Sequence, residues 1–171
     1  RFFGVLGLLA VAAVVLGGLL WLSVIVSGGQ YVQGYTVQTG WPYWLAIGGL
    51  WTDAVVVAAF SLWIASLSTV QMLPVALGAL FAVAGKSLGA VLDYLERGAD
   101  GDQELAGRYG PLLQIIQYLL PDLSRLDWRV WPMYGIPLSE GAVAYGLLLA
   151  AGYVTILLAM AVMTFSRREF F

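Results

Sequence analysis

The chain has 171 residues, of which 61% are hydrophobic and only 11% are charged, and its formal net charge is −2. A soluble domain usually carries about 25% charged residues, so this composition indicates a membrane protein. The sequence has no cysteine and no histidine, which excludes thiolate metal sites, disulfides, histidine-ligated haem and Ser-His-Asp or Cys-His catalysis. The slightly acidic balance also gives no basic footprint for nucleic acid.

Four long apolar blocks hold most of the hydrophobic residues, and each exceeds the roughly 20 residues that a helix needs to span a bilayer. We expect these spans at residues 2–26, 45–67, 72–92 and 141–165. The sequence therefore predicts an all-α membrane protein with one transmembrane domain over residues 1–171. Because the first block begins directly after Arg1, we also expect that residues precede this sequence in the complete protein.

A polar loop follows the first block at residues 27–43, and aromatic residues mark its end. Trp41, Tyr43 and Trp44 fit the aromatic belt at a membrane interface. We therefore expect these side chains at the membrane surface, with the second span beginning at about Leu45.

The least hydrophobic part of the chain is segment 93–140, between the last two blocks. Residues 111–120 within it are mostly apolar but too few to span, so they predict a short interfacial or re-entrant helix. The apolar side chains of this helix are Leu112, Leu113, Ile115, Ile116, Leu119 and Leu120. Trp128, Trp131 and Tyr134 follow and are predicted to be further interface anchors.

The placement of arginines predicts the orientation in the membrane. Arg167 and Arg168 directly follow the last span, and Arg1 precedes the first. Four spans put both chain ends on one side, and the positive-inside rule makes that side the cytoplasm. Segment 93–140 is then an outer loop. We expect an integral protein in contact with membrane lipid, with both chain ends cytoplasmic.

Asp53 and Lys86 are the only ionisable residues well inside the predicted spans. A charge in lipid is costly, so such residues normally face protein or water and find partners. At about 1.5 Å per helical residue, both lie about 10–12 Å below the outer surface on adjacent helices, which predicts an ion pair. The pair either lines a substrate path or is purely structural, and the Lys86 amine could also extend toward the surface.

Small residues form a stripe along the third block, at intervals of four, three and four: Gly78, Ala82, Gly85 and Gly89. This spacing puts them on one face of a helix, where small residues permit another helix to approach closely. The stripe is predicted to serve in helix packing, either as a dimer seam or within one subunit.

Gly85-Lys86-Ser87 resembles the end of a phosphate-binding loop only superficially. That motif needs a glycine where this chain has Leu80, and these residues lie in a predicted span. The chain is therefore predicted not to bind or hydrolyse ATP by itself, not to be an enzyme, and to hold neither a cofactor nor a metal.

The segment IQYLLPDLSRLDWR at residues 116–129 resembles a stretch typical of ABC-2-type transporter permeases, between their last two spans. YGIPL at residues 134–138 is similar to that family's lead-in to the last helix. FSRREF at residues 165–170 is similar to its aromatic and basic exit from the membrane. The resemblance covers roughly the last 60 residues, while the earlier spans agree only in number and hydrophobicity.

This resemblance implies a permease subunit of an ABC transporter in a bacterial inner (plasma) membrane, served by a separate ABC ATPase subunit that holds ATP and Mg. It also implies pairing with a second permease copy, and the outer loop could contact an extracytoplasmic partner. Complete members of the family have six spans, of which this sequence would supply the last four. The cytoplasmic segment that docks on the ATPase would precede it. No substrate residue is carried over, because the family shares no substrate motif.

Two other functions stay open on the sequence. A non-catalytic structural or accessory subunit of a larger membrane complex fits the absence of catalytic chemistry equally well. A secondary transporter or channel predicts more intramembrane polar groups and usually an internal repeat, and the sequence shows neither.

Overall fold

The computed structural model describes residues 2–28, 37–96 and 122–168. Every regular element among them is helical: α1 (Phe2–Ser27), α2 (Trp41–Leu67), α3 (Leu73–Glu96), η2 (Leu123–Leu126), α5 (Val130–Tyr134) and α6 (Ala142–Arg168). The four long helices are long and apolar enough to cross a membrane. The predicted all-α fold with four spans is therefore confirmed, and the chain is an integral membrane protein. The short helix predicted at residues 111–120 lies outside the described residues.

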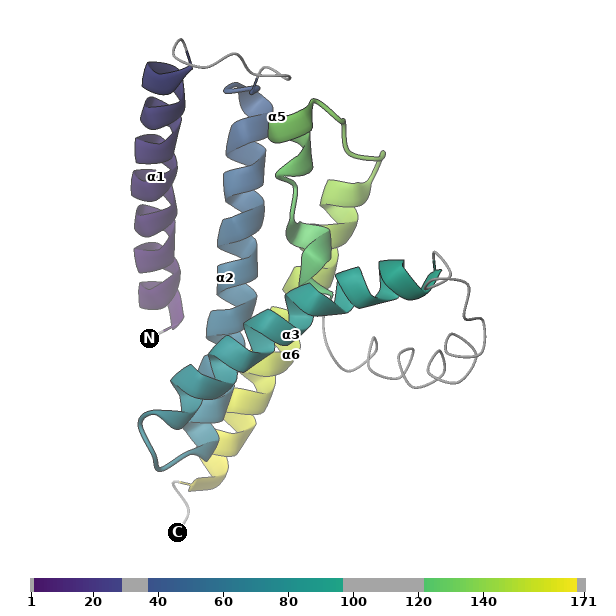
Figure 1. Cartoon of the computed structure of the whole chain (residues 1–171). Coiled ribbons are helices and arrows are strands. Elements are labelled where there is room, and N and C mark those ends of the chain that lie inside the picture. Colours follow the sequence, from purple (N-terminus) through teal and green to yellow (C-terminus); the bar gives the residue numbers. More distant parts are fainter. Residues whose placement is uncertain (1, 29–36, 97–121, 169–171) are drawn as a thin grey trace.

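Helix α2 is at the centre of the bundle, where it contacts α1, α3, α5, α6 and η2. Figure 1 shows α1 beside α2, and α6 running in the same direction as α2. Helix α3 crosses α2 obliquely, so that its C-terminal end lies near the mid-height of the bundle (Figure 1). The start of α1 and the end of α6 lie toward the same end of the molecule, as an even number of spans requires.

Helix α2 begins at Trp41, earlier than the predicted start at Leu45. Pro42 lies in its first turn, where the missing backbone N–H and the fixed φ of proline suit a helix start. The aromatic cluster is thus the first turn of the span and not a loop before it. Asp53 is twelve residues from the helix start, or about 18 Å, which places it near the middle of α2 and deeper than predicted.

Helix α1 is the most exposed span, and Gly17 is its buried residue. The Tyr43 hydroxyl of α2 donates a hydrogen bond to the carbonyl oxygen of Gly17 at 2.5 Å. The Trp21 indole donates to the carbonyl oxygen of Thr39 at 3.0 Å. Helix α1 is therefore joined to the bundle through α2, and most of its remaining surface is exposed.

The hydrophobic core lies where η2 and Trp128 meet the long helices. Its buried members are Val56, Phe81, Leu123, Leu126, Trp128 and Ala150. Phe60 of α2 stacks on Phe81 of α3 with 4.1 Å between the ring centroids. Trp128 is only 3% exposed, so the prediction that it anchors the chain at the interface is wrong. Its indole N–H donates to the carbonyl oxygen of Arg125 at 2.9 Å, which satisfies the only polar group of the ring and permits burial.

Candidate functional site

Between the last two spans the chain folds back against the membrane helices at residues 122–134, here called the folded-back segment. Within it, η2 packs against α2, α3 and α6, and α5 packs against α2. Figure 1 shows the segment, in green, running beside the upper halves of α2 and α6. Backbone without helical hydrogen bonds is tolerated at membrane depth only when protein buries it or water reaches it. The folded-back segment therefore needs contacts with the membrane helices that bury its backbone.

Three glycines from three helices form that place, here called the glycine socket. A methyl group on Gly49 of α2 would collide with the backbone carbonyl oxygen of Leu126. A methyl group on Gly89 of α3 would collide with the Ser124 hydroxyl. At Gly146 of α6 it would lie 3.4 Å from the Leu126 side chain, which is an ordinary van der Waals contact. Two of the three positions, Gly49 and Gly89, therefore leave the room that η2 occupies because they carry no side chain.

The predicted small-residue stripe of α3 faces parts of the same chain. Its members are Gly78, Ala82, Gly85 and Gly89, of which Gly78 and Gly85 are buried. A methyl group on Gly78 would collide with the Ser61 hydroxyl of α2, just as Gly89 leaves room for Ser124. These contacts favour packing within the subunit over a dimer seam for this face of α3.

The two charges inside the spans lie together. Lys86 Nζ of α3 is 2.7 Å from Asp53 Oδ2 of α2, so the ion pair ties the oblique helix to the central one. The Asp53 side chain is 11% exposed and the Lys86 side chain is 43% exposed. Asp53 Oδ1 is buried and accepts no hydrogen bond from any described residue. Whether the pair is structural or lines a path stays a prediction.

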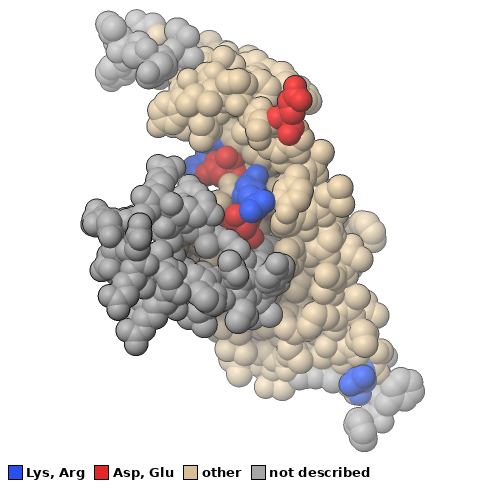
Figure 2. Space-filling model, turned by 90° about the vertical axis from the view of Figure 1, so that its right-hand side faces the viewer, with Lys and Arg blue, Asp and Glu red and all other residues tan. Residues whose placement is uncertain are grey.

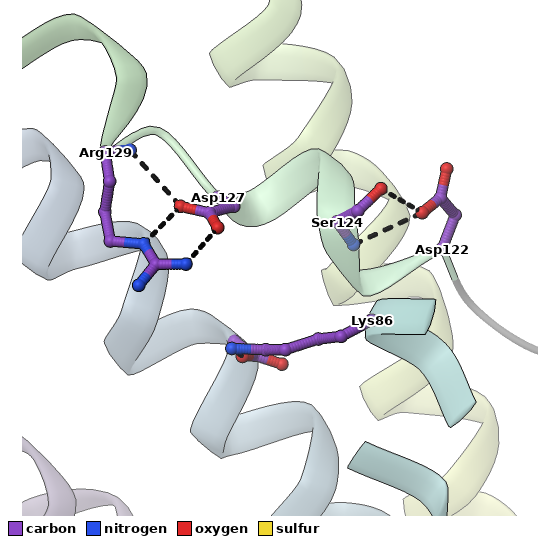
Figure 3. Close-up of polar contacts among 6 residues, drawn as sticks. Lys86, Asp122, Ser124, Asp127 and Arg129 are labelled. Atoms are coloured by element: carbon purple, nitrogen blue, oxygen red, sulfur yellow. Dashed lines mark hydrogen bonds and ion pairs between the residues drawn. The ribbon is translucent and has the colours of Figure 1, made fainter. Parts of the chain in front are cut away.

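Sequence reasoning missed two further ion pairs, both inside the folded-back segment. Arg125 Nε lies 2.9 Å from Asp122 Oδ2, and Arg129 pairs with Asp127 through both Nε and Nη2. Asp122 also caps η2, because its Oδ1 accepts from the Ser124 backbone N–H at 3.2 Å and from the Ser124 hydroxyl. Figure 3 shows the Asp127–Arg129 and Asp122–Ser124 contacts on either side of Lys86. The signal in the sequence was the close alternation of acids and bases at residues 122–129.

The pairs are close enough to act on one another. The hydrogen bond from Arg129 is the main cause that lowers the pKa of Asp127, and the positive charge of Lys86 lowers it further. Asp127 in turn raises the pKa of Arg129, and the negative charge of Asp53 adds to that effect. Asp53, Lys86, Asp127 and Arg129 therefore form one electrostatic unit of alternating sign.

This unit and the Asp122–Arg125 pair together are here called the charge cluster. Figure 2 shows basic and acidic residues gathered on one face, next to uncharged surface of the described helices. The cluster has equal numbers of acids and bases, so it is electrically neutral as a whole. Among the described residues no group of His, Cys, Asp and Glu could hold a metal ion. The chemistry that the cluster offers is hydrogen bonding and charge pairing.

Comparisons with known proteins add no relatives. The chain matches no protein-family model, and neither the curated proteins nor the solved structures contain a match. The residues and their geometry are therefore the grounds on which a function can be argued.

Proposed function

We propose that the chain is the membrane-spanning permease subunit of an ABC transporter, which couples ATP hydrolysis by a separate subunit to substrate movement or force transmission across the membrane. The observation that carries the proposal is the folded-back segment between the last two spans. Its residues 122–129 belong to the stretch that resembles ABC-2-type permeases, and they dock against three of the four spans.

The contacts offer a route by which force could reach the segment. Residues 68–72, which join α2 to α3, lie toward the end of the bundle that also holds the end of α6. A load applied there would act along α3, which is tied to α2 at Lys86 and touches Ser124 at Gly89. Coupling between distant sites travels through such contiguous packed elements when they have two arrangements. Movement of α3 would thus shift the folded-back segment and the charge cluster together.

The residues of the chain indicate which tasks of the transporter belong to other subunits. ATP and Mg belong to the partner ATPase, since the sequence has no phosphate-binding loop. The arginines that end α6 support a cytoplasmic position for that end of the bundle, where the ATPase would bind, in a bacterial inner membrane. A second permease copy would complete the transporter, and the outer loop could contact an extracytoplasmic partner.

The proposal is tested by isolating the chain with its natural partners. The tagged chain is expressed in its own host, extracted in a mild uncharged detergent, and its companions are identified by mass spectrometry. We expect a nucleotide-binding subunit in near-equal amount, together with ATP hydrolysis that vanadate inhibits. Recovery of a respiratory or photosynthetic core without such a subunit would overturn the proposal in favour of an accessory role.

A further inference from the structure

The bases of the charge cluster face outward, and its acids face inward. The side-chain exposed fractions are 43% for Lys86 against 11% for its acid, 49% for Arg125 against 15%, and 54% for Arg129 against 30%. In all three ion pairs the base is the more exposed partner, both in the pair that joins α2 to α3 and in the two pairs of the folded-back segment. An approaching molecule therefore meets cations first, even though the cluster is neutral as a whole.

The outward bases also keep hydrogen-bond donors to spare. A lysine ammonium has three donors and an arginine guanidinium has five. Among the described residues, Lys86 uses its amine on Asp53, and Arg125 uses Nε on Asp122. Arg129 uses Nε and Nη2 on Asp127. The Arg125 guanidinium lies over the Tyr145 ring, 5.3 Å from its centroid, which fixes the plane of the remaining donors.

The acids offer little to an incoming cation. Asp53 is a buried residue, and its Oδ1 has no contact with solvent. Asp122 Oδ1 is occupied by the Ser124 N–H and hydroxyl, and Asp122 Oδ2 by Arg125. Both oxygens of Asp127 accept from Arg129. The accessible hydrogen-bonding capacity of the cluster is thus that of donors, which suits an anion.

Exposed apolar side chains lie beside two of these bases, Lys86 and Arg129. Val83 lies one helical turn before Lys86 on the same face of α3 and is largely exposed, and Val130 follows Arg129 and is exposed too. A hydrocarbon chain lying along this surface would be shielded from water in the bilayer. The combination fits a ligand with one charged end and one apolar end.

We propose that the outward face of the charge cluster binds the anionic group, a phosphate or carboxylate, of a membrane-soluble amphiphile. The inference rests on the proposed function in that the bound amphiphile would be the transported substrate. Charge-assisted hydrogen bonds from Lys86, Arg125 and Arg129 supply the affinity at short range. Because the cluster is neutral overall, it gives no long-range attraction, and binding depends on contact with the donors.

The test measures equilibrium binding of radiolabelled dodecyl phosphate to the purified full chain in an uncharged maltoside detergent. We expect saturable binding that dodecyltrimethylammonium does not displace. Inorganic phosphate is expected to compete only at far higher concentration, because it lacks the alkyl chain that keeps the amphiphile in the detergent layer next to the protein. Equal affinity for the cationic amphiphile would overturn the inference without any variant. Competition by inorganic phosphate at equal concentration would overturn the amphiphile as the ligand.

Variants locate the binding. Two double variants replace a cationic donor by a neutral amide while leaving no charge unpaired. One combines Asp53→Asn with Lys86→Gln, and the other combines Asp127→Asn with Arg129→Gln. Each double variant is expected to weaken binding about tenfold or more, the effect of losing a charge-assisted hydrogen bond. Arg167→Gln is the matched control, since it removes a cation at the far end of α6, and it should bind like the unaltered chain. Unchanged affinity in both double variants, or an equal loss in Arg167→Gln, would contradict the assignment.

The binding experiment and the isolation of partners can refute their two proposals separately. Dodecyl phosphate binding is measured without the ATPase, so a chain that recruits an ATPase but ignores the phosphate refutes only the ligand. A chain that binds the phosphate but recruits no ATPase refutes only the transporter.

Discussion

Asp53 and Lys86 contribute unequally to their ion pair because one is buried and the other is half-exposed. If Lys86 loses its charge, the Asp53 carboxylate remains buried near the middle of α2 without a counter-ion. If Asp53 loses its charge, the Lys86 amine can turn toward water on its long side chain. Removing the charge of Lys86 therefore leaves a buried unpaired charge, whereas removing the charge of Asp53 does not.

This asymmetry predicts the order of stability among three variants. Lys86→Gln should destabilise the fold by about 2 kcal/mol or more, because breaking a buried pair strands a charge. Asp53→Asn should cost less, and the double variant should recover most of the loss. Thermal unfolding in detergent, followed by tryptophan fluorescence, gives the order. If the double variant assembles normally but transport or ATP hydrolysis stays impaired, a purely structural role for the pair is excluded.

The glycine socket makes a second prediction at the residue scale. In Gly49→Ala the new methyl group meets the backbone carbonyl of Leu126, which cannot rotate away, so we expect a loss of about 2 kcal/mol. Gly48→Ala is the control on the same helix, because nothing lies within 4 Å of its added methyl group. It should be neutral or slightly stabilising, since alanine favours helix over glycine. Equal melting temperatures for the two variants would mean that η2 does not dock as described.

The Asp127–Arg129 pair predicts a dependence on pH. The pKa of Asp127 is lowered from its ordinary value of 3.8 in the folded protein, chiefly by the hydrogen bond from Arg129. The stabilisation is therefore complete above the ordinary pKa and is lost as the pH falls from about 4 through the lowered pKa. Thermal unfolding measured from pH 6 to pH 3 should show a destabilisation that is smaller in Asp127→Asn. An identical fall in both proteins would contradict the pairing.

Among single residues, the sequence predicted the roles of those whose type or spacing differs from the apolar residues around them. Asp53 and Lys86 could be paired because no other charge lies inside the predicted spans. Gly78 and Gly89 could be assigned to packing because they recur at helical spacing. Gly49, Gly146 and the burial of Trp128 could not be predicted, because they depend on a segment that docks from elsewhere in the chain.

Among the helices, α1 is the least securely attached. The hydrogen bond from Tyr43 to Gly17 and that from Trp21 to Thr39 are its polar ties within the described residues. No hydrophobic driving force favours helix association inside lipid, so such bonds and close packing decide how firmly a peripheral span is held.

Tyr43→Phe should loosen this attachment. Loss of the hydroxyl removes the bond to Gly17 and should cost about 1 kcal/mol, typical of hydrogen bonds between membrane helices. Tyr94→Phe near the end of α3 is the control, because that side chain is exposed. Thermal unfolding of the two variants compares the effects. A Tyr43→Phe variant as stable as the control would show that α1 is held by packing alone.

The elements themselves were largely predictable from hydrophobicity. All four spans exist, since an apolar stretch of this length has no stable alternative in lipid. The start of α2 was predicted too late because aromatic residues that suit an interface also suit the first turn of a helix. The docking of residues 122–134 and the oblique path of α3 could not be predicted, because both depend on contacts between elements and not on periodicity within one.

Over the whole molecule, the oblique path of α3 brings the mid-depth charges, the glycine socket and the folded-back segment into one place (Figure 1). Under the proposed function, ATP hydrolysis by a partner subunit moves this assembly. Because the chain has no cysteine, a single introduced cysteine is the only thiol on it that a maleimide can label. Ser124→Cys reports on η2 at its contact with α3, and Ile136→Cys is an exposed control outside it.

The most direct measurement is the labelling rate of Ser124→Cys in host membranes, with and without ATP and vanadate. We expect the labelling rate of Ser124→Cys to change several-fold when the nucleotide is trapped, and the rate of Ile136→Cys to stay the same. Identical rates at Ser124→Cys with and without trapped nucleotide would show that ATP use by a partner does not move η2.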